Sequence, residues 1–245
     1  MAFVWLCVVL GGLWLLGVLL SRHIQGLILL LSGSPRVASS AYDVLVLPGV
    51  VLHELCHVAL ARLLGIRVLH VNLFQLRSQG DARQGEVVVA KADPLRMSLV
   101  GAAPLLGGMI VLLLLVRWLD PPAIGLDRAV LTQLRALLAD PWSALGLYLL
   151  VAVANTMFPS AADRQAWWVV GVIVVLGLGL LLLLGVRPQL PPLWLSTLAT
   201  QAQRLSTALV QVVVVDLAVL VVVLLLELLI GRIRGRRVVY RTHRS

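Results

Sequence analysis

Two histidines and a glutamate stand close together in an apolar stretch of the sequence. His53 and His57 are four residues apart and Glu54 follows the first of them, which gives the pattern HExxH. On a helix, residues four apart lie on one face, so both imidazoles can bind one metal ion with Glu54 beside it. Two neutral imidazoles as ligands and a carboxylate as general base are the arrangement of zinc proteases, so the pattern predicts a Zn²⁺ site. The alternative is a pair of core histidines, which would leave a buried carboxylate without a partner.

A catalytic zinc ion takes three protein ligands and keeps one position open. Asp163 is the leading candidate for the third ligand, and Asp216 is the next. However, Ser160 and Asp163 also have the spacing of a capping box, in which Asp163 would close the first turn of a helix. The spacing alone leaves both roles of Asp163 open. His70 is a ligand candidate by residue type only, and a polar strand position explains it more simply.

The composition places these residues in a membrane. The chain is 60% hydrophobic and 13% charged, with a mean hydropathy of +1.01, which excludes an ordinary soluble domain. The net charge is +9, but six of the twenty Lys and Arg residues follow the last apolar run. Such a tail favours orientation in the membrane and contact with anionic lipid, and nucleic acid is not an expected partner. Cys7 and Cys56 lie in apolar runs and predict no disulfide framework.

The predicted fold is an all-α polytopic membrane protein with about six transmembrane helices and a small β-hairpin at the cytoplasmic surface after the HExxH helix. The expected spans are residues 2–20, 42–64, 94–119, 142–158, 167–186 and 208–230. Residues 67–90 alternate and contain turn signals, which predicts the hairpin. Two strands alone are marginally stable, so the hairpin must rest on the helices or on a partner strand.

Breaks and short segments between the spans complete the expected arrangement. Ser21-Arg22-His23 is expected to end the first span, which makes residues 24–31 an interfacial or re-entrant piece. Pro48-Gly49 is expected to kink the HExxH helix. Residues 129–138 and 193–207 are expected to form a short helix and an interfacial helix.

The whole of residues 1–230 is expected to form a single metalloprotease-like domain, followed by a basic tail at residues 231–245. Six spans place both termini on the same side of the membrane, and that side receives most of the Lys and Arg residues. Positive charge favours the cytoplasmic side, so both termini and the hairpin are predicted to be cytoplasmic. The expected location is the cell membrane.

Three motifs follow one another along these spans. HELCH is followed by a span that contains Gly101 and Pro104, and then by Asn155, which precedes Asp163 by eight residues with a proline between them. In this order the chain resembles the site-2 protease family of intramembrane zinc metalloproteases, over about residues 48–163. A β-hairpin after the HExxH helix is also common in that family.

The resemblance implies a role for each matching residue. Asp163 would be the third zinc ligand, Glu54 the catalytic base, and Asn155 a residue that helps to position the substrate. The chain departs from the family pattern at two positions: Pro159 is four residues after Asn155, where three is usual, and Arg164 follows Asp163, where glycine is usual. These departures concern the handling of substrate more than the binding of metal.

The expected function is hydrolysis of peptide bonds in or near the transmembrane segments of a membrane-protein substrate. One alternative is a catalytically silent, protease-like scaffold or accessory subunit of a larger membrane complex. Another is an ion or proton transporter that uses Asp216 and Glu227, because acidic residues within spans are functional candidates.

Overall fold

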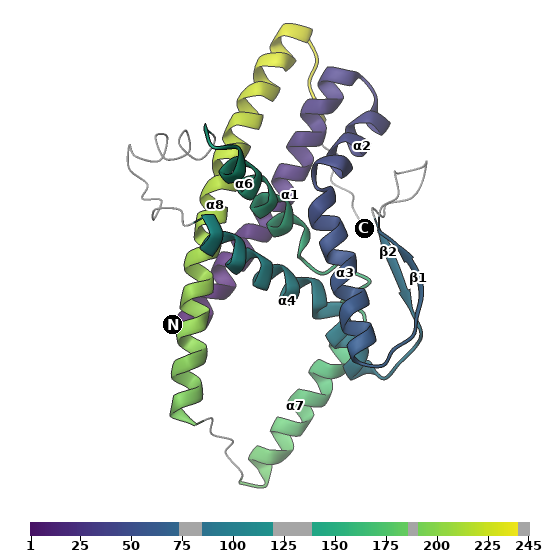
Figure 1. The fold of residues 1–245 in the computed structure, drawn as a ribbon, viewed down its shortest axis with the longest axis vertical. Helices are drawn as coiled ribbons and strands as arrows, with labels where there is room; N and C mark the ends of the chain where they lie inside the picture. Colours follow the sequence, from purple (N-terminus) through teal and green to yellow (C-terminus); the bar gives the residue numbers. More distant parts are fainter. Residues whose placement is uncertain (74–84, 120–138, 186–190, 240–245) are drawn as a thin grey trace.

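The structure, a computed structural model, describes residues 1–73, 85–119, 139–185 and 191–239. Within these ranges the chain forms seven helices and one two-stranded antiparallel hairpin (Figure 1). The expected helix at residues 129–138 lies outside the described residues, as does the hairpin tip. The elements are α1 (Ala2–Ser32), α2 (Pro35–Leu45), α3 (Leu47–Leu63), β1 (Val68–Asn72), β2 (Glu86–Val89), α4 (Pro94–Leu119), α6 (Pro141–Thr156), α7 (Trp167–Leu183) and α8 (Pro192–Arg234).

Long apolar helices make this an integral membrane protein. Among the described residues, α1, α4 and α8 are each long and apolar enough to cross a membrane, and α2 with α3 adds a fourth span if that bent pair is counted as one. The fourth and fifth predicted spans correspond to α6 and α7, which have 16 and 17 residues. These two helices are shorter than the ~20 residues that a perpendicular span requires. The structure therefore supports three to four of the six predicted spans.

Helix α1 continues through the polar stretch that was expected to end it. The Ser21 hydroxyl donates to the Val18 carbonyl 3.0 Å away, and His23 Nδ1 lies 2.8 Å from Glu227 Oε2 on α8. Because both polar side chains have partners, they do not break the helix, which ends only at Gly33 with a φ of 70°. The predicted interruption, and with it a separate re-entrant piece, is wrong.

Helices α1 and α8 pack side by side and run in the same direction (Figure 1). Val9, near the start of α1, packs in one cluster with Leu209, near the middle of α8, and at the far ends of both helices Arg234 donates to the carbonyl of Leu31. The predicted interfacial helix and sixth span are one continuous helix of 43 residues. Parallel helices that both cross a membrane place the start of one and the end of the other on opposite sides. The parallel packing disfavours the prediction that both termini are cytoplasmic, and the side on which each terminus lies stays a prediction.

The HExxH helix is bent away from the helix before it, as predicted. Helices α2 and α3 meet at an angle of 66°, with the break at Val46. Pro48 lies in the first turn of α3, where its missing N–H removes no helical hydrogen bond. Gly49 faces α6, and a Cβ there would collide with the Thr156 hydroxyl and the Ala152 carbonyl. This glycine lets the start of α3 touch the end of α6.

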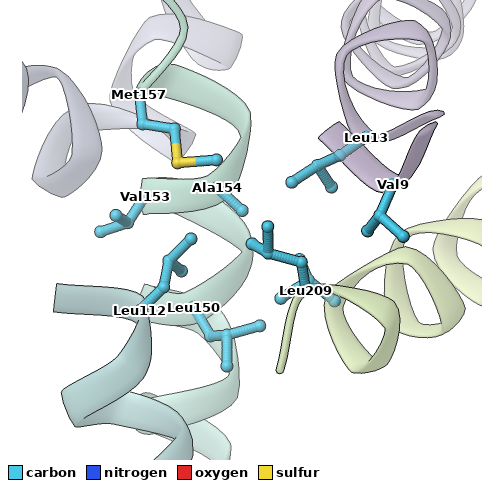
Figure 2. Packing of buried hydrophobic residues seen from close by; sticks show 9 residues of the cluster. Val9, Leu13, Leu112, Leu150, Val153, Ala154, Met157 and Leu209 are labelled. Atoms are coloured by element: carbon cyan, nitrogen blue, oxygen red, sulfur yellow. The ribbon is translucent and has the colours of Figure 1, made fainter. Parts of the chain in front are cut away.

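The largest core cluster lies where α1, α4, α6 and α8 meet (Figure 2). Helix α6 and its C-cap, Met157, contribute residues at positions i, i+3, i+4 and i+7, which lie on one face. Packing of this kind in a membrane relies on close van der Waals contact, since lipid is as apolar as the side chains. The cluster fixes the end of α6, from which the chain enters the functional site. Its buried members are Val9, Leu13, Leu112, Leu150, Val153, Ala154, Met157, Leu209 and Val212.

The hairpin is present where it was predicted and rests on the helices. Strands β1 and β2 pair antiparallel, with an irregularity between Val68 and His70. Val68 and Val89 pack against a buried group made of Ala61, Ile66 and Val100, which belongs to α3, α4 and their connections. This support supplies the stability that two isolated strands lack.

Candidate metal centre

Three side chains meet at one point beside α3. His53 and His57 lie on successive turns, and their Nε2 atoms are 3.3 Å apart. Asp163 enters from the segment between α6 and α7, with Oδ1 3.1 Å from His57 Nε2 and Oδ2 3.6 Å from His53 Nε2. Across the described ranges this is the one group of His, Cys, Asp or Glu side chains placed to hold a metal ion. Neither His70 nor Asp216 belongs to it.

Backbone carbonyls orient both imidazoles. His53 Nδ1 donates to the Thr156 carbonyl 2.7 Å away, and His57 Nδ1 donates to the Val100 carbonyl 2.9 Å away. A carbonyl oxygen only accepts, so in each neutral ring the proton is on Nδ1 and the Nε2 lone pair is free. Two lone pairs and a carboxylate therefore face one another, which is a repulsive arrangement unless a cation lies among them. In zinc sites, the imidazole nitrogen that does not face the metal usually donates its N–H to a carbonyl or carboxylate. That hydrogen bond fixes which nitrogen carries the proton.

The distances fit a zinc ion. Around a tetrahedral zinc with metal–ligand bonds of about 2.0–2.2 Å, neighbouring ligand atoms are about 3.3 Å apart. The two Nε2 atoms are 3.3 Å apart, and the carboxylate approaches His57 Nε2 through Oδ1 at 3.1 Å and His53 Nε2 through Oδ2 at 3.6 Å. Two imidazoles and one carboxylate leave a fourth position open, as in catalytic zinc sites. The donor set therefore fits the metal that the sequence predicts.

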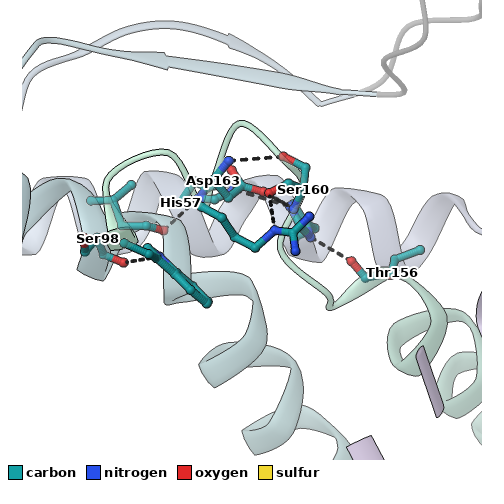
Figure 3. Close-up of polar contacts among 9 residues, drawn as sticks. His57, Ser98, Thr156, Ser160 and Asp163 are labelled. Atoms are coloured by element: carbon teal, nitrogen blue, oxygen red, sulfur yellow. Dashed lines mark hydrogen bonds and ion pairs between the residues drawn. The ribbon is translucent and has the colours of Figure 1, made fainter. Parts of the chain in front are cut away.

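Asp163 also makes the reciprocal bonds of a capping box with Ser160. These bonds close a turn and not the first turn of α7, because α7 begins at Trp167 and its N-cap, Ala166, makes no side-chain hydrogen bond. The Ser160 N–H donates to Asp163 Oδ2 at 2.7 Å, and the Asp163 N–H donates to Ser160 Oγ at 3.3 Å. Burial acts to raise the pKa of the Asp163 carboxyl, but hydrogen bonds from His53 and His57, when their Nε2 atoms are protonated, and from Ser160 outweigh it and hold that pKa below its ordinary value. A bound cation would take the place of those Nε2 protons. The reciprocal bonds position the carboxylate, whose Oδ1 remains directed at His57 (Figure 3).

Replacing Ser160 by alanine should weaken zinc binding without unfolding the protein. The substitution removes the hydroxyl that accepts from the Asp163 N–H and leaves the Ser160 N–H in place. We expect a loss of zinc affinity of about 10-fold, as for other outer-shell partners, and a loss of about 1 kcal/mol in the free energy of unfolding. Titration against a chromophoric chelator measures the affinity.

The chain contains a matched control for this substitution. At the start of α6, Ser143 Oγ donates to Asp140 Oδ2 at 2.7 Å and the Ser143 N–H donates to the same carboxylate. Ser143→Ala should cost similar stability and leave zinc affinity unchanged. Equal zinc affinity in Ser160→Ala and the unaltered chain would show that the capping box does not position the ligand.

Glu54 lies beside the three donors and is buried, with 8% of its surface exposed. The start of β2 passes directly over it: a Cβ at Gly85 would lie 2.8 Å from Glu54 Cγ and 3.0 Å from Oε1. The absence of a side chain at Gly85 therefore allows the hairpin to approach the carboxylate. Sequence reasoning assigned Gly85 only to a turn, since nothing local shows which residue a strand will cover.

A cavity of about 530 Å³ opens between α3, the hairpin and the segment that carries Asp163. Its lining includes the three donors, Glu54, the first residues of β2 and Asn155. In Figure 3 the strands pass along one side of the donors. A cavity of this size between a metal donor set and a strand is suited to a short extended peptide.

Residues that hold the Asp163 segment in place were missed by sequence reasoning. The Trp167 indole N–H donates to the Ser98 carbonyl at 3.2 Å, and Arg164 Nε donates to the Ser160 carbonyl at 3.2 Å. Gly101 brings α4 against this segment, because a Cβ there would collide with the Asp163 carbonyl. The small-residue run that begins at Gly101 was the available signal, since small residues mark close helix contacts.

Asn155 contacts α8 and not the three donors. Its Nδ2 donates to both carboxylate oxygens of Asp216, at 3.2 and 3.0 Å, and to the Val151 carbonyl at 2.9 Å. An interhelical hydrogen bond of this kind is the simpler explanation of a membrane asparagine. Asn155 nevertheless lines the cavity, and its role in positioning substrate stays a prediction.

Comparisons of the chain with known protein families, with curated proteins and with solved structures found no match.

Proposed function

We propose that the protein is an intramembrane zinc metalloendopeptidase that hydrolyses peptide bonds in or near the transmembrane segments of other membrane proteins. The observation that carries the proposal is the convergence of His53 Nε2, His57 Nε2 and the Asp163 carboxylate, with Glu54 next to them in one cavity. Glu54 favours a catalytic zinc site over a purely structural one, because a structural zinc needs no adjacent general base.

Each residue has a defined part in the proposed reaction. His53, His57 and Asp163 hold the ion, and zinc, when bound, supplies Lewis-acid chemistry that activates water and polarises a carbonyl. Glu54 accepts a proton from the attacking water and returns it to the leaving amine nitrogen, so that the carbon–nitrogen bond breaks without releasing an amide anion. The carbonyls of Thr156 and Val100 keep both imidazole Nε2 atoms unprotonated.

The substrate class follows from the surroundings of the cavity. A helical substrate has its carbonyls hydrogen-bonded, so it must unwind before any peptide bond can react. Residues 85–87, at the start of β2, line the cavity directly beside Glu54. A strand in this position can hold an unwound segment by strand addition, which leaves the scissile carbonyl directed at the donors.

A second candidate is a catalytically silent scaffold or accessory subunit of a larger membrane complex. The reciprocal bonds between Ser160 and Asp163 favour it, because they give Asp163 a structural role that needs no metal. In this alternative Glu54 would have no chemical role.

The purified protein should contain about one zinc ion per chain, and His53→Ala should lose it. The substitution removes one of three donors and also the hydrogen bond to the Thr156 carbonyl. Elemental analysis of protein prepared without chelators measures the zinc content. His70→Ala is the matched control, because His70 is exposed on β1 and belongs to no donor group in the described part of the chain.

The absence of any transition metal from the unaltered protein would contradict the metalloprotease and any zinc-bearing scaffold. Full zinc content in His53→Ala would place the metal elsewhere.

A further inference from the structure

A second cavity, of about 820 Å³, lies where the far ends of α1 and α8 meet. It shares no lining residue with the cavity around His53 and His57, so it is a separate feature of the molecule. Its wall is apolar on one side and its rim is basic. The apolar residues are Leu30 on α1, Leu224 and Leu228 on α8, and Val238 after it. The basic residues are Arg232, Arg236 and Arg237.

The end of the chain is folded so that these arginines gather at the rim. Gly235 ends α8 with a φ of 62°, and the Arg236 N–H donates back to the Gly231 carbonyl at 3.1 Å. The resulting reversal returns Arg236 and Arg237 to the cavity. Arg234 does not line the cavity, because its guanidinium donates to the carbonyls of Leu30 and Leu31, which belong to the last turn of α1. These hydrogen bonds link the end of α8 to the end of α1.

The charge at the rim is strongly positive. Three guanidinium groups line the cavity, and the one carboxylate among its lining residues is that of Glu227. That carboxylate lies 2.8 Å from His23 Nδ1, so it is held on the helix wall by a neighbour from α1. Arginine side chains are cationic in proteins, so these three residues make the rim positive.

The apolar residues and the arginines are spaced along α8 as the acyl chain and the headgroup of a lipid are spaced across one leaflet. Residues 217–226 of α8 are all apolar, and the first arginine follows five residues after Glu227. At a rise of 1.5 Å per residue this is about 7.5 Å along the helix, from acyl depth to the polar boundary of the membrane. Leu224 and Leu228 therefore lie where an acyl chain would pass, with the guanidinium groups at the level of a headgroup.

We propose that this cavity binds one anionic phospholipid, with its phosphate among Arg232, Arg236 and Arg237 and its acyl chain against Leu224 and Leu228. Guanidinium groups match phosphate oxygens in charge and in hydrogen-bond geometry. The apolar wall adds contact that a soluble phosphate could not make. This inference does not depend on the proposed enzymatic activity.

Native mass spectrometry of the full chain in detergent tests the proposal, with phosphatidylglycerol and phosphatidylcholine of identical acyl chains as probes. We expect the first phosphatidylglycerol to bind about 10-fold more tightly than phosphatidylcholine, and Arg232→Gln/Arg236→Gln/Arg237→Gln to abolish that preference. Arg36→Gln is the matched control. Arg36 is exposed on α2, which begins just after α1 ends, so it lies near the same membrane surface but does not line the cavity.

Equal binding of the two lipids to the unaltered chain would overturn the proposal, and this comparison needs no variant that might fail to fold. A preference that persists in the triple variant, or that is lost equally in Arg36→Gln, would also overturn it. Inorganic phosphate at millimolar concentration should not displace the bound lipid. Displacement would identify a site for free phosphate and not for a lipid.

Discussion

Glu54→Gln should bind zinc like the unaltered protein and lose cleavage of a membrane-embedded substrate by about 10²-fold or more, the usual contribution of a general base. The amide has the shape of the carboxylate and fits against Gly85, but it cannot accept the proton from water. Zinc should remain because Glu54 is not among the three donors. Cleavage of a reconstituted substrate and zinc content, measured on the same preparation, give both results.

Asp93→Asn controls for the loss of one negative charge. Asp93 is about half exposed, pairs with Arg96 at the start of α4 and lies outside the cavity, so cleavage should not change. Cleavage at the normal rate by Glu54→Gln would exclude Glu54 as the base. If Glu54→Gln has no effect in cells while deletion of the whole protein does, the scaffold is the better description.

Asp163→Asn should lose zinc affinity by 10-fold or more, and with it activity, while the protein stays folded. Asparagine can still accept from the Ser160 N–H through its amide oxygen, so capping is largely preserved. It brings no negative charge to the two imidazoles. Zinc affinity and the thermal midpoint of unfolding, measured together, separate the two roles of this residue.

The corresponding change at the start of α6 is a matched control. Asp140 caps α6 through Ser143, as Asp163 pairs with Ser160, but it is exposed and does not line the cavity around the donors. Asp140→Asn should leave zinc affinity unchanged. If Asp163→Asn retains full affinity and only Asp163→Ala is damaging, then Asp163 is a cap and not a ligand.

Features that depend on neighbours in sequence were predictable. The spacing of His53 and His57 fixes their common face, and the structure brings their Nε2 atoms together as expected. The span predicted at residues 94–119 coincides with α4, and the hairpin forms from the two predicted β-rich runs. The ambiguity over Asp163 was genuine, because one carboxylate has two oxygens and can serve both roles.

Features that depend on distant partners were not predictable. Ser21-Arg22-His23 looked like the end of a span because the carboxylate that receives His23 is 204 residues further along the chain. The carbonyls that orient the imidazoles belong to Val100 and Thr156, and every residue has a carbonyl, so no residue type marks them. The sequence also could not show that Asn155 bonds to Asp216, because the two residues meet only when α6 packs against α8.

The parallel packing of α1 and α8 affects the order in which the protein folds during its synthesis. Contacts between residues far apart in sequence raise the contact order, and the contact of His23 with Glu227 cannot form before Glu227 has been synthesised. At a synthesis rate of 5–20 residues per second, the 204 residues between His23 and Glu227 correspond to about 10–40 s. During that interval His23 is without Glu227, whereas Asn155 waits only for the 61 residues up to Asp216, about 3–12 s. Helix α8 must therefore be synthesised before the interior of the molecule can close around α6.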